Sequence, residues 1–94
     1  MANEPYEPIR KDPAATLDYG FDWTEWLATD EIIDESTWDV PTGLTKGDTE
    51  SGEKVTLVWL SGGTAGRSYQ CTNRISTNQD RTDERTLTIK VVER

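Results

Sequence analysis

Apolar side chains alternate with polar ones in several short runs, and the first of these covers residues 16–23. Leu17, Tyr19, Phe21 and Trp23 are separated there by polar or small residues. A period of two is typical of a strand that buries one face. We therefore predict a strand with these four side chains in the core, ending near residues 24–25.

A second strand is predicted over residues 36–40, with Trp38 and Val40 on one face. Pro-Thr-Gly at residues 41–43 ends it, because proline and glycine interrupt strands. Leu44 follows in a short extended piece. Residues 46–53 contain two glycines and no apolar residue, and this composition predicts a solvent loop.

Residues 54–60 are apolar on both faces of a predicted strand. Val55, Leu57 and Trp59 occupy one face, and Val58 and Leu60 occupy the other. Such a strand is either covered on both sides or offers one face to a partner. We interpret the face with Val58 and Leu60 as the docking surface.

The two last predicted strands form an antiparallel hairpin. The first covers residues 68–76, and the second covers residues 85–92, with a polar turn over 77–84 between them. The inward side chains are Tyr69, Cys71, Asn73 and Ile75 from the first strand and Leu87, Ile89 and Val91 from the second. With six or seven short strands and no secure helix, the predicted fold is an all-β, immunoglobulin-like antiparallel sandwich.

Residues 1–13 contain three of the four prolines and are expected to form an extended arm ahead of a sandwich domain at 14–94. The arm carries Tyr6 and Ile9 beside Pro5 and Pro8. Apolar side chains have little use in a disordered tail. We therefore expect these four residues to contact a partner or the domain itself.

The run from Gly62 to Cys71 is the most informative motif. In immunoglobulin-like folds a tyrosine two residues before the second cysteine bonds to upstream backbone and fixes the crossing between sheets. Tyr69 has this spacing to Cys71, and Gly62, Gly63 and Gly66 supply a tight crossover. Trp38 is the candidate core tryptophan. The alternative interpretation of the glycines is a flexible loop with no defined role. A phosphate-binding loop is disfavoured because no helix is predicted after it.

Charge and composition narrow the function further. The net charge of the 94 residues is −8, and residues 14–53 hold eleven acidic residues against Lys46 alone. A strongly acidic chain repels phosphate, so we expect no nucleic-acid partner. The acidic first half and the more basic second half could attract each other, within one molecule or between two copies. The alternative is that these charges are simply solvated at the surface. No secretion signal or membrane segment is expected, which predicts a protein kept in a cytosol or in something assembled there.

The sequence offers few residues that could serve in catalysis or bind a metal. The chain has no histidine and one cysteine, which excludes histidine-based triads, thiolate clusters and an internal disulfide. We expect Cys71 to be a small buried apolar side chain. The acidic residues Asp30, Glu31, Asp34 and Glu35 lack the spacing of a calcium loop, so a solvated turn is favoured. We predict no enzyme activity and no cofactor.

Several segments together resemble a known family. They are Lys11-Asp12-Pro13, residues 17–19, 21–27 and 36–38, Trp59 to Gly66, Tyr69, residues 72–75 and Arg81 to Arg85. This pattern, over residues 11–92, is similar to that of small proteins encoded among the head and tail genes of tailed bacteriophages, some of which are labelled fiber-tail adaptors. The resemblance implies a virion part that joins larger components and is assembled in the bacterial cytoplasm.

Two functions stay open from the sequence. The first is an adaptor at the head-tail or tail-fiber junction, present as a ring of copies that contact portal, tail, fiber or capsid proteins. The second is a capsid-decorating or glycan-binding module on the virion surface, in which an exposed aromatic such as Trp26 binds host sugars. Trp26 has the competing interpretation of packing in the core beside Trp23.

Overall fold

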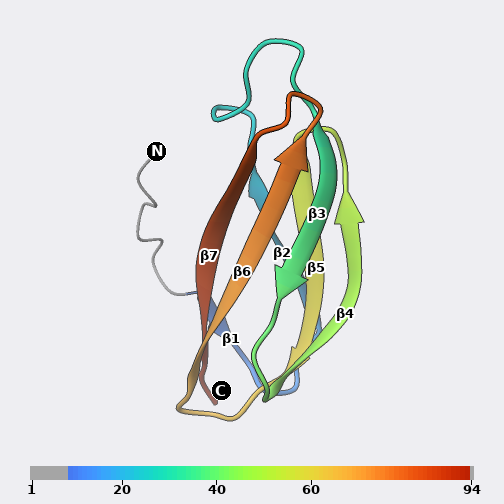
Figure 1. Cartoon of the computed structure of the whole chain (residues 1–94). Helices are drawn as coiled ribbons and strands as arrows, with labels where there is room; N and C mark the ends of the chain where they lie inside the picture. The colour runs from blue at the N-terminus through green and yellow to red at the C-terminus, as the bar shows by residue number, and fades with distance from the viewer. Residues whose placement is uncertain (1–8, 94) are drawn as a thin grey trace.

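The computed structural model describes residues 9–93, and this part of the chain contains seven strands and no helix (Figure 1). The strands are β1 (Ile9–Lys11), β2 (Leu17–Asp22), β3 (Ile33–Asp39), β4 (Leu44–Ser51), β5 (Val55–Gly62), β6 (Ser68–Thr77) and β7 (Thr82–Val91).

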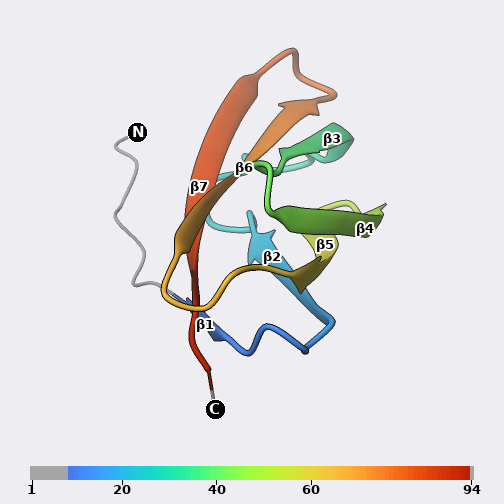
Figure 2. The same cartoon turned by 90° about the horizontal axis from the view of Figure 1, so that it is seen from below.

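The strands form two sheets that face each other. One sheet has the order β1-β7-β6-β3, and the other has the order β2-β5-β4. Seen from below, the sheets lie as two layers, and β3 and β4 meet along one side (Figure 2). This arrangement confirms an all-β sandwich; the narrower immunoglobulin-like assignment stays a prediction.

The predicted hairpin of the last two strands is confirmed. β6 and β7 pair antiparallel over nine residue pairs, from Ser68 with Lys90 to Ser76 with Thr82. β7 begins at Thr82, three residues earlier than the hydrophobic alternation indicated. Residues 82–86 are at least partly exposed, so they supply pairing without an apolar pattern.

Residues 46–53 fold differently from the expectation, and the described part of the arm contacts the domain itself, which was one of its two alternatives. Residues 46–53 were expected to be a loop, but β4 continues to Ser51 and pairs with β5. Only Leu44 of β4 is buried, so the strand is fixed by backbone pairing at a sheet edge, which leaves no hydrophobic pattern. In the expected arm, Ile9–Lys11 form β1 and pair in parallel with residues 89–91 of β7.

The core lies between the sheets, and most of the inward side chains are those predicted. Its buried apolar residues are Tyr19, Phe21, Trp23, Ile33, Trp38, Leu44, Val58, Leu60, Tyr69, Cys71, Ile75, Leu87, Ile89 and Val91. Trp38 stacks on Phe21 across the two layers, with ring centroids 5.7 Å apart and planes 6° from parallel. Leu17 was expected in the core but is 48% exposed; it is the first residue of β2, which is an edge strand of its sheet. Val40 lies just after β3 and is half-buried against the core.

A polar network joins the two sheets inside this core. Asn73 of β6 accepts hydrogen bonds from Thr56 of β5, at 2.6 Å, and from the Trp23 indole, at 3.1 Å. Its amide nitrogen donates to the Ser36 hydroxyl and the Thr37 carbonyl, both at 2.9 Å. Buried polar groups with such complete pairing fix the register of the elements that supply them.

Candidate functional site

The crossover between β5 and β6 carries the chain from one sheet to the other. Gly62, Gly63 and Gly66 have φ values of +78°, +99° and +89°, a region that side chains rarely adopt. A Cβ atom on Gly63 would lie 2.6 Å from Cγ2 of Val91, and one on Gly43 would lie 2.8 Å from Cε1 of Tyr69. Glycines therefore let both the crossover and the β3–β4 turn approach the core closely.

Tyr69 lies between these turns and contacts upstream backbone. The amide of Thr64 donates a hydrogen bond to its hydroxyl at 3.0 Å. This hydrogen bond lowers the pKa of Tyr69 from its usual value. The contact has the geometry that the motif predicted, while its role in holding the crossover stays a prediction. Cys71, two residues on, is a free and fully buried thiol, and burial raises its pKa to about 11.

Lys11 of β1 adds a contact at this end that the sequence did not indicate. The residue is 1% exposed, and its ammonium group donates to the carbonyl oxygens of Gly62, at 2.7 Å, and Asp12, at 2.9 Å. Desolvation lowers the pKa of Lys11. Burying a lysine costs free energy unless its ammonium group is hydrogen-bonded. Here the hydrogen bond to Gly62 connects β1 to the start of the crossover.

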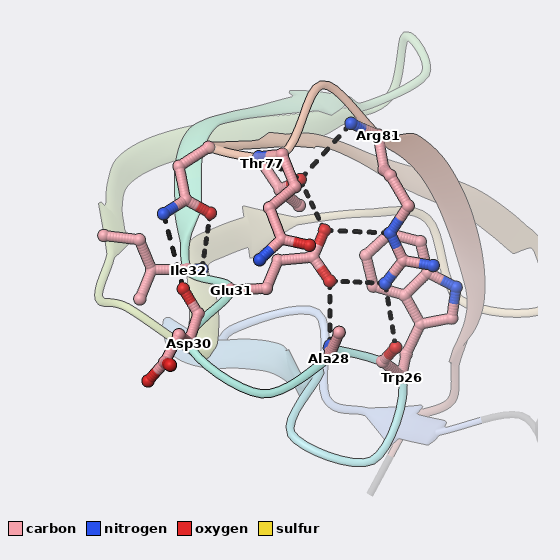
Figure 3. A network of polar contacts seen from close by, with 9 residues as sticks. Trp26, Ala28, Asp30, Glu31, Ile32, Thr77 and Arg81 are labelled. Atoms are coloured by element: carbon pink, nitrogen blue, oxygen red, sulfur yellow. Dashed lines mark hydrogen bonds and ion pairs between the residues drawn. The ribbon is translucent and has the colours of Figure 1, made fainter.

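The opposite end of the sandwich is held by an ion pair between the β2–β3 loop and the β6–β7 turn (Figure 3). Arg81 donates from Nε to Oε2 of Glu31 at 2.8 Å, and its Nη2 contacts Oε1. Glu31 also accepts from the Thr77 hydroxyl, at 2.6 Å, and from the Ala28 amide, at 2.8 Å. A carboxylate with a bidentate arginine and two further donors is a strong buried anchor.

The electrostatics of Glu31 follow from these contacts. The Arg81 hydrogen bonds, against the cost of burial, lower the pKa of Glu31 to about 2. Glu31 was grouped with Asp30, Asp34 and Glu35 as a solvated acidic turn, but its side chain is fully buried. Within residues 9–93, no group of three or more potential metal ligands lies together.

Trp26 is engaged in the same end of the molecule. Its ring packs edge-on against Trp23 with centroids 5.5 Å apart, and the Arg81 guanidinium lies 4.2 Å above its centre. The carbonyl of Trp26 also accepts a hydrogen bond from Arg81 at 3.2 Å. Of the two interpretations of Trp26, packing beside Trp23 is the one that the structure supports, since Trp26 is half-buried against the core.

The docking face assigned to β5 is the wrong face of that strand. Val58 and Leu60 are both fully buried in the core, and the polar Thr56 shares their face. Val55 and Trp59 are instead 40% and 37% exposed on the other side, with Leu57 between them. Periodicity assigned the two sets to opposite faces correctly, but it does not say which set the second sheet covers.

The interface candidates in the arm are only partly described. Pro5, Tyr6 and Pro8 lie outside the described residues, so their contacts remain predictions. Ile9 is in β1 opposite Ile89 and is 38% exposed. None of residues 9–93 belongs to a helix long and apolar enough to cross a membrane.

Residues 11–90 match the family described as "Podophage GP4 fiber-tail adaptor protein gp77". The matched region begins at Lys11 and includes the crossover, Tyr69, Glu31 and Arg81. The chain belongs to this bacteriophage fiber-tail adaptor family. No curated protein matches the chain.

The family match covers both ends of the sandwich. The protein is a structural component of a phage virion, and its family is one of adaptor proteins. The match ends one residue before Val91, so it includes nearly all of β7 and excludes the first two residues of β1.

Proposed function

We propose that this protein joins a fiber to the tail of a podophage-type virion through protein–protein contacts and without catalysis. The observation that carries the proposal is the family match over residues 11–90, which spans both sheets. Assembly takes place in the host cytoplasm, from which fiber and tail components are recruited. Portal and capsid proteins are more distant candidates for the same contacts.

The described structure supports a mechanical joining role. Both ends of the sandwich carry contacts between segments far apart in sequence, at Lys11 with Gly62 and at Glu31 with Arg81. These contacts leave the broad outer faces of the sheets available. A sandwich that is tied together at both ends suits a part that holds two larger components together.

A ring of copies around the tail is part of the proposal. Closed rings form when one surface of a subunit meets a different surface of the next. The net charge of −8 disfavours nucleic acid as a partner and favours protein surfaces of opposite charge. The acidic and basic halves of the sequence also meet within the molecule, since Glu31 and Arg81 come one from each half.

No second function is proposed. The glycan-binding alternative named Trp26 as its example of an exposed aromatic, and that ring packs on Trp23 and under Arg81.

Deletion of the gene in a phage that encodes the protein tests the proposal. The expected result is DNA-filled particles that lack fibers in electron micrographs and fail to adsorb, with fibers restored by the protein supplied in trans. Infectious particles with a normal set of fibers from the same deletion would overturn the proposal.

A further inference from the structure

The outer face of β5 presents a continuous apolar stripe to solvent. We call Val55, Leu57 and Trp59 the β5 stripe; they alternate with the buried Thr56, Val58 and Leu60. Val55 and Trp59 are 40% and 37% exposed, and Leu57 is half-buried. β5 is the middle strand of its sheet, so the stripe runs along the centre of that face and not at its edge.

Glycines in both neighbouring strands make room for the stripe. A Cβ atom on Gly20 of β2 would lie 2.6 Å from Cδ2 of Leu57, and one on Gly47 of β4 would lie 3.3 Å from Cβ of Trp59. The same Cβ atom on Gly20 would lie 2.0 Å from the backbone carbonyl oxygen of Thr56, so a side chain at this position would clash with the β5 backbone as well as with Leu57. The absence of side chains here lets the stripe lie flat and accessible, which is a geometry suited to docking a protein surface.

Acidic side chains border the stripe on both sides. In the register of the sheet, Asp18 lies opposite Trp59, Asp22 lies opposite Val55, and Glu50 lies opposite Leu57. All three acids are exposed. Lys46 of β4 does not neutralise Asp18 or Glu50, because its ammonium group reaches to the Trp38 carbonyl on the other sheet. The charge of Asp22 is partly compensated by the nearby Arg85 and Lys54.

This charge pattern selects the kind of partner. Two copies meeting stripe to stripe would bring the acidic borders together, and like charges oppose such a contact. A surface with an apolar centre and lysine or arginine at its edge would match both the stripe and its border. Resting on the adaptor function above, we propose that the β5 stripe is the docking surface for a basic-edged apolar patch on a different virion protein.

The experiment measures binding of the purified full chain to phage particles assembled without it. Labelled protein is mixed with particles from the deletion phage, and the bound fraction is measured by co-sedimentation at about 0.05 to 0.5 M NaCl. Trp59→Ser tests the stripe, and the double variant Asp18→Lys, Glu50→Lys tests its border. Leu17→Ser is the control for an exposed apolar residue off the stripe, and Glu35→Lys is the control for charge on the opposite sheet.

The proposal predicts that Trp59→Ser and the double charge reversal each weaken binding at least about tenfold. Binding of the unchanged protein weakens with added salt, both controls bind normally, and all variants keep a cooperative melting transition. The charge reversal involves only exposed side chains, so it remains informative if Trp59→Ser does not fold.

Two results would overturn the assignment of the surface. One is normal binding by the folded charge-reversal variant, and the other is loss of a homodimer when the stripe is changed, seen by analytical ultracentrifugation. The unchanged protein failing to bind fiberless particles would contradict the adaptor function itself. The two failures are therefore distinguishable.

Discussion

The two ends of the sandwich are held in different chemical ways. At the crossover end, positive-φ glycines, the hydroxyl of Tyr69 and the buried Lys11 bring turns together through backbone contacts. At the opposite end, one ion pair between Glu31 and Arg81 joins the β2–β3 loop to the β6–β7 turn (Figure 3). The first end depends on close packing and on hydrogen bonds to backbone groups, and the second depends on an ion pair between two side chains.

This difference decides how each end responds to change. The close packing at the crossover does not tolerate added atoms. Its hydrogen bonds from Lys11 and to Tyr69 are insensitive to low pH, because both side chains stay protonated there. The ion pair has room at the surface, since the Arg81 side chain is 43% exposed, but it requires an ionised Glu31. Mutation and pH can therefore separate the two ends.

The largest effect is expected from Glu31→Gln. It removes the charge from a fully buried side chain and leaves Arg81 without its ionised partner. We expect the melting temperature to fall by about 15 °C or more. The matched control is Glu84→Gln, in the exposed pair with Arg74 at 3.2 Å, which should change it by about 2 °C or less. Equal effects from the two variants would contradict the anchoring role of Glu31.

The pH dependence of stability should come from the same carboxylate. The folded pKa of Glu31, about 2, lies below its ordinary value of 4.5, so its stabilising contribution is complete above that value and is lost as pH falls toward 2. The melting-temperature gap between the unchanged protein and Glu31→Gln should be constant above about pH 5 and narrow below it. A gap that stays constant down to pH 2 would show that folding does not lower the pKa of Glu31.

At the crossover end, Gly63→Ala should be the most damaging single change. It combines a φ of +99° with a Cβ position 2.6 Å from Val91, and we expect a loss of about 10 °C. Gly66→Ala is the control, because its φ of +89° gives similar strain but no atom lies within 4 Å of its Cβ position. Thermal melts of both should show the smaller loss for Gly66→Ala; the reverse order would count against close packing at Gly63.

Tyr69→Phe should have the smallest of these effects. It removes only the hydroxyl that accepts from Thr64, and we expect the melting temperature to fall by about 5 °C, with no change in the pH profile at low pH. An unchanged melting temperature would show that this hydrogen bond does not help to hold the crossover.

Local spacing explains why the Tyr69 contact could be predicted from the sequence, whereas the contact of Lys11 with Gly62, 51 residues away, could not. Tyr69 and Thr64 are five residues apart, and the glycines lie beside them. All the residues that form the contact therefore occur in one short segment of the sequence. Glu31 and Arg81 are 50 residues apart, and each occurs in a polar turn that looks solvated. Nothing in their local sequence distinguishes this pair from the other surface charges.

The strands were predictable where one face is buried and the other exposed. β6 and the second half of β7 show that alternation, and their inward residues were assigned correctly. β4 shows no alternation because seven of its eight residues are exposed. β5 alternates between two apolar sets, so its covered face is decided by the second sheet, which local sequence does not specify.

The parallel pairing of β1 with β7 has a consequence for how the molecule bears load. In parallel strands, the entry of β1 at Ile9 and the exit of β7 beyond Val91 lie at opposite ends of the paired segment. A force applied to the chain at these two points loads the pairing of Ile9, Arg10 and Lys11 with β7 in shear. The backbone hydrogen bonds are then stretched together and not broken one after another. Traction along the chain must then break several bonds at once, including the tether from Lys11 to Gly62.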